Sequence, residues 1–218
     1  MSTSKLELYN DALMICGERL LHTTTGLTEE REPRRLLDHV WDSEGVDACL
    51  EAGQWKFAMR TVMIDYDPDI TPEFGLQRAF AKPDDWINTS ALCSDEYFNV
   101  PLLQYVDEAG YWYAELDTIY VRYVSNDANY GGDLSLWPSR FTNYVAAYFA
   151  DKIILKLTSD KERIDKVEKK LEKNLLLAKS SDAMAGPTVF PPQGGWSQSR
   201  QGYSRSRRDR GSRGQLIG

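Results

Sequence analysis

The side chains of this sequence that could do chemistry are mainly carboxylates, and their densest group lies in the stretch DYDPD. Asp65, Asp67 and Asp69 have the spacing of the first three ligands of a calcium-binding loop. Ile70 stands where such a loop needs a glycine, and Leu76 stands where it needs a bidentate glutamate. The stretch is therefore predicted to be a solvated turn, and no metal ligand is assigned to it.

The remaining candidates for catalysis are equally sparse. Asp84 and Asp85 follow Pro83 and are predicted to form a turn, while His22 and His39 have no second ligand at metal spacing. The chain lacks the phosphate-binding, dinucleotide-binding, hydrolase and zinc-protease motifs, and no nucleophile has a nearby base. We therefore predict no catalytic residue, no metal and no cofactor.

The cysteines and the distribution of apolar residues favour a chain without a disulfide framework and without a membrane span. Cys16, Cys49 and Cys93 are odd in number and widely spaced, which favours reduced, buried thiols over a disulfide framework. No run of about 18 apolar residues occurs, and the first residues lack the apolar stretch of a secretory signal. We expect no membrane partner.

Charge is unevenly distributed along the 218 residues, whose formal net charge is −7. From Ser197 onward there are six arginines and one aspartate, so this end carries +5 and the rest of the chain −12. Such an end can be a disordered solubilising tail, a segment that binds nucleic acid, or an arm that docks on a partner protein. As an arm it would use aromatic anchors and arginines: Phe190, Trp196, Arg200, Tyr203, Arg205, Arg207, Arg208, Arg210 and Arg213.

A second aromatic group, Tyr111-Trp112-Tyr113, falls within a predicted strand. Alternation along a strand places Tyr111 and Tyr113 on one face and Trp112 on the other. One face is expected to be core, and the other is either ordinary surface or a contact with a partner protein.

The elements that must position these residues are predicted from periodicity and caps. Helices are expected over residues 5–17, 31–52, 139–157 and 160–180, with Gly17 ending the first and Gly45 weakening the second. Strands are expected over 55–64, 76–80, 100–106, 111–116 and 118–124, and DEAG (107–110) forms a hairpin turn. The predicted fold is α+β: a four-helix bundle with an inserted antiparallel β-meander (54–125), together forming a body (1–185), and an extended arm (186–218).

Several stretches, taken in order, resemble one known family. LYNDALMICGERLLHTTTGLTEE, VDACLEAGQWKFAMR, FAKPDDW, YVRYVSN and WPSRFTNYVAAYFADKIILKLTSDKE follow one another across residues 6–180. In this order they resemble the tail tubular protein A family, the head-to-tail adaptors of short-tailed bacteriophages. Lys82 departs from the family's usual leucine, and the sequence after residue 186 departs as well.

The resemblance implies a structural virion protein in the neck between capsid and tail. Its members form a ring, commonly of twelve copies, between the portal protein and the tail nozzle protein, and DNA passes through the centre without specific binding. The resemblance further implies that the C-terminal arm reaches the portal. Tyr111, Trp112 and Tyr113 are then candidates for a nozzle or lateral contact. The alternative function is nucleic-acid binding through the arginine-rich tail.

Overall fold

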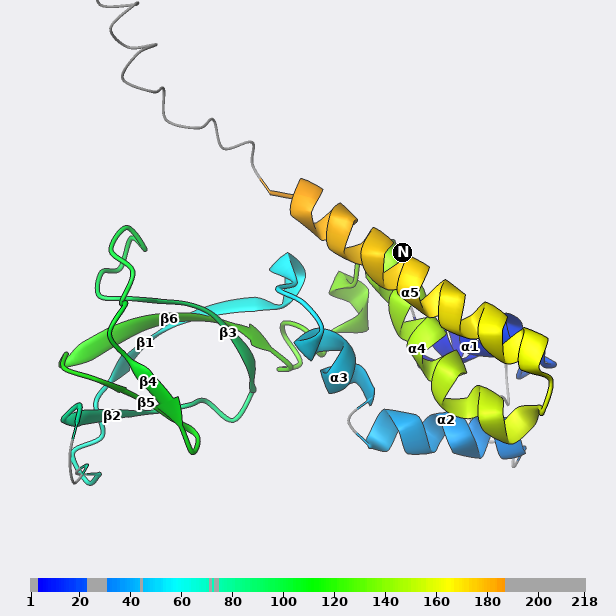
Figure 1. Ribbon diagram of the computed structural model, residues 1–218, viewed down its shortest axis with the longest axis horizontal. Helices are drawn as coiled ribbons and strands as arrows, with labels where there is room; N and C mark the ends of the chain where they lie inside the picture. The colour runs from blue at the N-terminus through cyan, green and yellow to red at the C-terminus, as the bar shows by residue number, and fades with distance from the viewer. Residues whose placement is uncertain (1–3, 23–30, 44, 71, 73–74, 187–218) are drawn as a thin grey trace, which may run out of the picture. The chain divides into compact units, whose positions relative to one another are not determined.

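The computed structural model describes residues 4–22, 31–43, 45–70, 72 and 75–186. Nearly all of them belong to one compact unit, Met1–Ala185. Within this unit the helices gather in one group and the strands in another (Figure 1). The predicted arm, apart from Gly186, lies outside the described residues.

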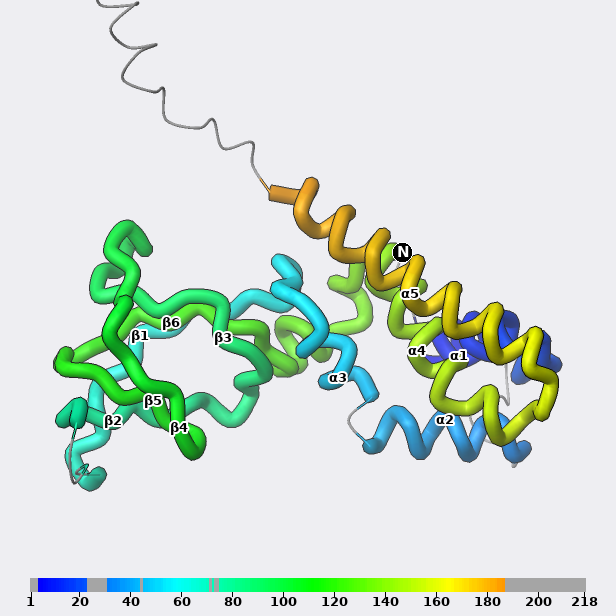
Figure 2. Tube along the Cα trace, in the orientation of Figure 1, coloured from blue at the N-terminus to red at the C-terminus, as the bar shows by residue number. Residues whose placement is uncertain are grey.

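The predicted four-helix bundle is wrong. The described residues form five helices: α1 (Lys5–Cys16), α2 (Glu32–Asp42), α3 (Gly45–Glu51), α4 (Ser139–Leu157) and α5 (Lys161–Met184). The other four all pack against α4, and α5 runs beside it along its length (Figure 2). The physical reason is that α4 is apolar on almost every face, from Phe141 to Ile154, so it is a central helix and not one of four equivalent members.

The helix predicted over 31–52 is interrupted, which is one cause of that error. α2 ends at Asp42 and α3 begins at Gly45. A Cβ atom added to Gly45 would lie 2.4 Å from the carbonyl oxygen of Val40 and 3.2 Å from the ring of Phe149. Only glycine permits this approach, so the predicted weak point is a complete break between two helices.

The other helix ends follow their sequence signals. Ser4 and Glu7 form a reciprocal capping box at the start of α1, and Gly17 ends that helix with a φ of 76°. The Asp160 carboxylate accepts a hydrogen bond of 3.0 Å from the backbone N–H of Glu162 at the start of α5. α5 continues to Met184, four residues beyond the prediction.

The predicted single meander is also wrong, because the described strands form two antiparallel three-stranded sheets. One sheet has the order β1 (Met59–Asp65), β6 (Thr118–Ser125), β3 (Trp86–Cys93), and the other has the order β2 (Arg78–Ala81), β5 (Tyr111–Ala114), β4 (Val106–Glu108). β3 was not predicted, because its sequence WINTSALC does not alternate cleanly and its pairing with β6 contains two register shifts. A group of helices beside a separate group of antiparallel strands remains compatible with the predicted α+β class.

Four predicted strands differ from the structure by more than one residue, and the one predicted over 111–116 is β5, which ends two residues earlier at Ala114. The stretch 55–64 begins with a 3-10 helix (Lys56–Ala58), because Trp55 is buried among the helices and its indole N–H donates to the Cys49 carbonyl at 3.0 Å. The strand predicted over 76–80 is β2, shifted two residues at its start, and that predicted over 100–106 becomes β4 only at Val106. The hairpin turn has two residues and not four, since Glu108 pairs with Tyr111.

Two hydrophobic clusters stabilise the unit. The larger lies among the helices and includes Trp55, Phe141 and Phe149, while the smaller lies between the sheets and includes Phe80, Trp112 and Tyr123. The three cysteines are free and buried, as predicted. Burial raises the pKa of the Cys49 thiol to about 12 and that of Cys16 to about 11.

Candidate interaction surface

A surface of unusual composition is formed by residues 94–106, the loop between β3 and β4 together with the first residue of β4. Large apolar side chains are exposed there; Leu103 is 86% exposed and Tyr97 75%. Isolated exposed apolar residues are normal, but a close succession of them marks a contact site. The members of this exposed apolar loop are Tyr97, Val100, Leu103, Tyr105 and Val106.

The exposed apolar loop is held in one conformation by its own hydrogen bonds. The Asp95 carboxylate accepts from the backbone N–H groups of Asn99 (3.0 Å) and Val100 (2.8 Å). The backbone N–H of Ser94 donates to the Val100 carbonyl at 3.1 Å, which closes the turn at its base. These backbone hydrogen bonds, that of Val100 first, lower the pKa of Asp95 below its ordinary value.

Phe98 attaches the loop to the sheet beneath it. Its φ of 57° lies in the left-handed region, which a bulky side chain rarely adopts. Its ring packs on the guanidinium of Arg122 in β6, 4.4 Å from ring centroid to Cζ. A second attachment is the backbone N–H of Leu102, which donates to the Leu92 carbonyl at 2.9 Å. The backbone that carries the exposed apolar side chains is therefore anchored before binding, which lowers the entropy cost of binding.

The aromatic group of β5 divides between the two faces of its strand. Trp112 is fully buried and packs edge-on against Trp86, with ring centroids 6.4 Å apart. Tyr111 and Tyr113 lie on the other face, partly exposed, with their rings 6.4 Å apart. Tyr113 pairs with Val106 of the exposed apolar loop. Of the three predicted contact residues in β5, the two tyrosines are therefore available to a partner and Trp112 is not.

Lys82, which departs from the family pattern, packs inside the strand group. Its Nζ lies 3.7 Å from the centroid of the Trp86 ring and 2.6 Å from the Asp107 carboxylate. Asp107 pairs with Trp112 across β4 and β5. The lysine thus ties the start of β3 to the edge of the second sheet, a structural role.

Asp85, predicted to lie in a turn, is a junction between strands. Its carboxylate accepts from Ser125 Oγ (2.5 Å), Arg60 Nη1 (2.8 Å) and the Tyr123 hydroxyl (3.0 Å). Burial acts to raise its pKa, but these hydrogen bonds outweigh burial and hold the pKa below the ordinary value of 3.8. Asp85 therefore fixes the start of β3 to β1 and β6.

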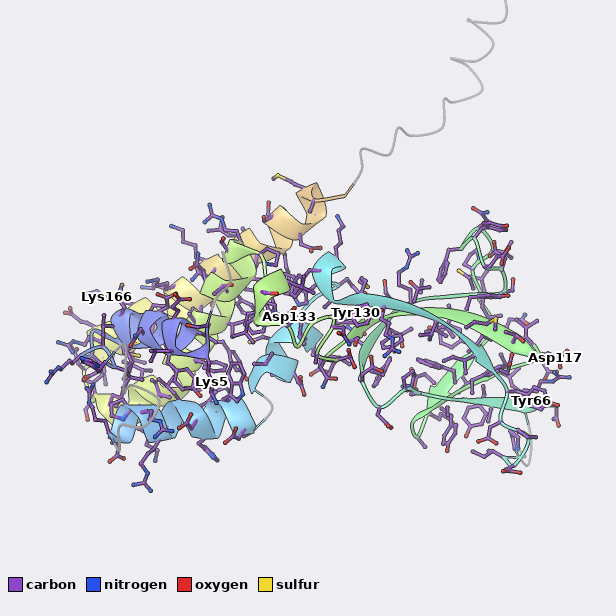
Figure 3. All side chains as sticks on the ribbon, turned by 180° about the vertical axis from the view of Figure 1, so that it is seen from behind. Lys5, Tyr66, Asp117, Tyr130, Asp133 and Lys166 are labelled. Atoms are coloured by element: carbon purple, nitrogen blue, oxygen red, sulfur yellow. The ribbon has the colours of Figure 1, made fainter. Side chains whose placement is uncertain are left out.

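The stretch DYDPD follows β1 at the opposite end of the strands. Asp65 accepts from Thr118 Oγ1 at 2.6 Å, and Asp67 accepts from the backbone N–H of Asp69 at 3.0 Å. Tyr66 and Asp117 lie close together there (Figure 3), and the Tyr66 N–H donates to the Asp117 carbonyl at 3.1 Å. The Asp65 carboxylate thus serves a strand end, and the Asp67 carboxylate serves a local turn.

The two histidines are both surface residues. His39 is an exposed residue of α2, and His22 is exposed beyond α1. Among the residues that the structure describes, no group of three His, Cys, Asp or Glu side chains could hold a metal ion. The predicted docking residues of the arm lie outside the described residues: Phe190, Trp196, Arg200, Tyr203, Arg205, Arg207, Arg208, Arg210 and Arg213.

Sequence reasoning missed the exposed apolar loop because it assigned residues 100–106 to one arm of a hairpin. Asp95, Asn99 and Pro101 were available as turn signals. They place the turn where the structure has it and leave Val100 and Leu103 outside the regular strand.

Comparison with known proteins gives no further assignment. Neither the models of known protein families nor the curated protein sequences contain a match to this chain. None of the helices in the described ranges combines the length and apolar character that crossing a bilayer demands.

Proposed function

We propose that this protein is a structural component of a short-tailed bacteriophage particle, an adaptor in the neck between capsid and tail. In this role a ring of copies, twelve by the family resemblance, joins the portal protein to the tail nozzle protein. The genome passes through the ring, and no membrane or cofactor takes part. The proposal starts from the ordered family-like stretches over residues 6–180.

The observation that carries the proposal is the exposed apolar loop. Tyr97 and Leu103 are exposed on a loop whose backbone is fixed by Asp95 and whose ring residue Phe98 packs on Arg122. This arrangement suits contact with another protein, because the backbone that carries these side chains is anchored before binding. We assign the loop, with Tyr111 and Tyr113, to lateral or nozzle contacts.

The separation of helices from strands supports the same proposal. A ring needs two different surfaces on each subunit, so that one copy binds the next head to tail. The strand group and the helix group each have their own hydrophobic cluster and can present such different surfaces. The acidic part of the chain, −12 before Ser197, repels DNA phosphates and favours passage of the genome over binding.

The test is assembly with the portal protein of the same virus. We expect the full chain to be monomeric when its mass is measured alone, and to form a ring on portal rings or on tailless capsids. Failure to associate with either contradicts the proposal. Binding to free DNA or RNA with a steep salt dependence, in a gel shift, supports the alternative nucleic-acid function instead.

A further inference from the structure

A small pocket lies between the helices and the loop that follows β6, and no function has been given to it above. Its volume is about 250 Å³, which suits a single side chain better than a drug-sized ligand. Gly132, between the labelled residues Tyr130 and Asp133 of Figure 3, forms one side. The lining consists of two indoles, two carboxylates and two small residues: Trp41, Asp42, Val46, Asp47, Gly132 and Trp137.

Both indoles of this pocket are held in place by the surrounding protein. The Trp137 indole N–H donates to the Gly131 carbonyl at 2.8 Å, and its ring meets Phe141 edge-on with centroids 5.1 Å apart. Trp41 meets Phe149 edge-on at 6.1 Å. Neither indole has to lose conformational freedom when a ligand enters the pocket, which favours binding.

The charged residues of the lining are all acidic. Asp42 is exposed at the end of α2, and Asp47 is partly buried in α3. The amide of Asn126 donates to Asp47 Oδ2 at 3.1 Å and so orients that carboxylate. The described lining contains no lysine or arginine. A described cation over one of these two indoles is Lys5, whose Nζ lies 4.8 Å from the Trp41 ring centroid and 3.6 Å from the Asp38 carboxylate.

Aromatic rings beside carboxylates are the surroundings that a guanidinium prefers. Its planar face packs on an indole, while its N–H groups donate to carboxylate oxygens. We propose that this pocket binds an arginine side chain presented by another polypeptide, with Asp42 and Asp47 as acceptors and Trp41 and Trp137 as walls. This inference goes beyond the proposed adaptor role, since it assigns a ligand class to a site that the role does not require.

The experiment uses the full chain and the peptide SRSRRDR, which has the sequence of residues 204–210. Binding is followed through the indole N–H resonances of Trp41 and Trp137 in NMR titrations. We expect saturable shifts of these two resonances. Affinity should fall about tenfold or more when every arginine of the peptide is replaced by citrulline, which keeps the shape and removes the charge.

Variants of the chain locate the site. Asp42→Asn, at an exposed position, and the double variant Asp42→Asn/Asp47→Asn are expected to weaken peptide binding about tenfold or more. Asp165→Asn, which removes one charge from the exposed side of α5, should leave binding unchanged. The proposal is overturned if the citrulline peptide binds as well as the arginine peptide, or if Asp42→Asn and the double variant bind like Asp165→Asn.

A last experiment distinguishes two possible sources of the arginine, which are another copy of this chain and a different protein. In a full chain whose tail arginines are replaced by glutamine, added peptide binds more tightly if tails compete for the pocket, and equally well if they do not. Both results require that the peptide binds in the pocket. The replaced residues are Arg200, Arg205, Arg207, Arg208, Arg210 and Arg213.

Discussion

Asp85 shows how much one side chain can contribute to this fold. Three donors from the two strands β1 and β6 meet at its carboxylate, although the sequence predicts only a turn after Pro83. The turn is visible in the sequence because proline and aspartate have local preferences. The hydrogen bonds of Asp85 to other strands are not visible in the sequence, because Arg60, Tyr123 and Ser125 are distant in the chain and no local pattern relates them to Asp85.

Replacing Asp85 by asparagine should lower the free energy of unfolding by about 2 to 3 kcal/mol at pH 7, since Arg60 loses its charged partner. The pKa of Asp85 is lowered on folding, so its stabilisation is complete above the unfolded value near 3.8 and is lost as the pH falls through the folded value. The difference between the variant and the wild type should therefore shrink in acid. Urea unfolding at several pH values measures it, with the exposed Asp84→Asn as control; equal effects of the two variants would refute the role.

A substitution at Ala109, in contrast, is expected to increase the stability of the protein. Ala109 and Gly110 have φ values of 47° and 84°, and a two-residue hairpin turn with both φ positive favours Asn-Gly. Ala109→Asn should raise the free energy of unfolding by about 0.5 to 1 kcal/mol. The matched change Gly110→Ala should lower it by a similar amount. Thermal unfolding of both variants checks the assignment, and a destabilised Ala109→Asn protein would contradict it.

At the scale of elements, the sequence predicts best where a cap and a strict period agree. α1, α4, α5 and β6 appear close to their expected bounds, because Gly17, Pro138, Asp160 and alternating residues mark them. The break at Gly45 and the order β1–β6–β3 depend on contacts between distant segments. Local signals carry no information about such contacts, and for this reason both the bundle and the meander were wrong.

Gly45→Ala tests the break between α2 and α3. The added Cβ would meet the Val40 carbonyl oxygen at 2.4 Å, and backbone cannot move aside as a flexible side chain can. We expect a loss of about 2 to 3 kcal/mol in the free energy of unfolding, measured by circular dichroism in urea. Ser43→Ala at the same junction is exposed and should change little. A Gly45→Ala protein as stable as the wild type would mean that one continuous helix is equally acceptable here.

At the scale of the whole molecule, the chain divides into a compact unit, Met1–Ala185, and a C-terminal segment of opposite charge. The described members of both hydrophobic clusters lie before residue 186, and the last residue of α5 is Met184. The Lys56 ammonium donates to the Asp182 carbonyl at 2.7 Å, which fixes the end of that helix beside the 3-10 helix Lys56–Ala58. The composition of the tail was enough to propose a docking arm but not to identify its partner.

Deletion of the residues after Gly186 should leave the thermal unfolding midpoint of the body unchanged within about 2 °C, since the described members of both clusters all remain in the shortened chain. The same deletion should abolish attachment to tailless capsids, measured by co-sedimentation. A truncated protein that sediments with capsids like the full chain would remove the arm from the proposed function.

We propose above all that this protein acts by joining other proteins, and that the backbone of its contact surfaces is anchored before binding. The most direct measurement compares the wild type with Tyr97→Ser/Leu103→Ser in ring formation and in binding to the tail nozzle protein. Both side chains are exposed, so the free energy of unfolding should be unchanged while binding falls about tenfold or more. Rings and nozzle binding of wild-type strength in this variant would contradict the account.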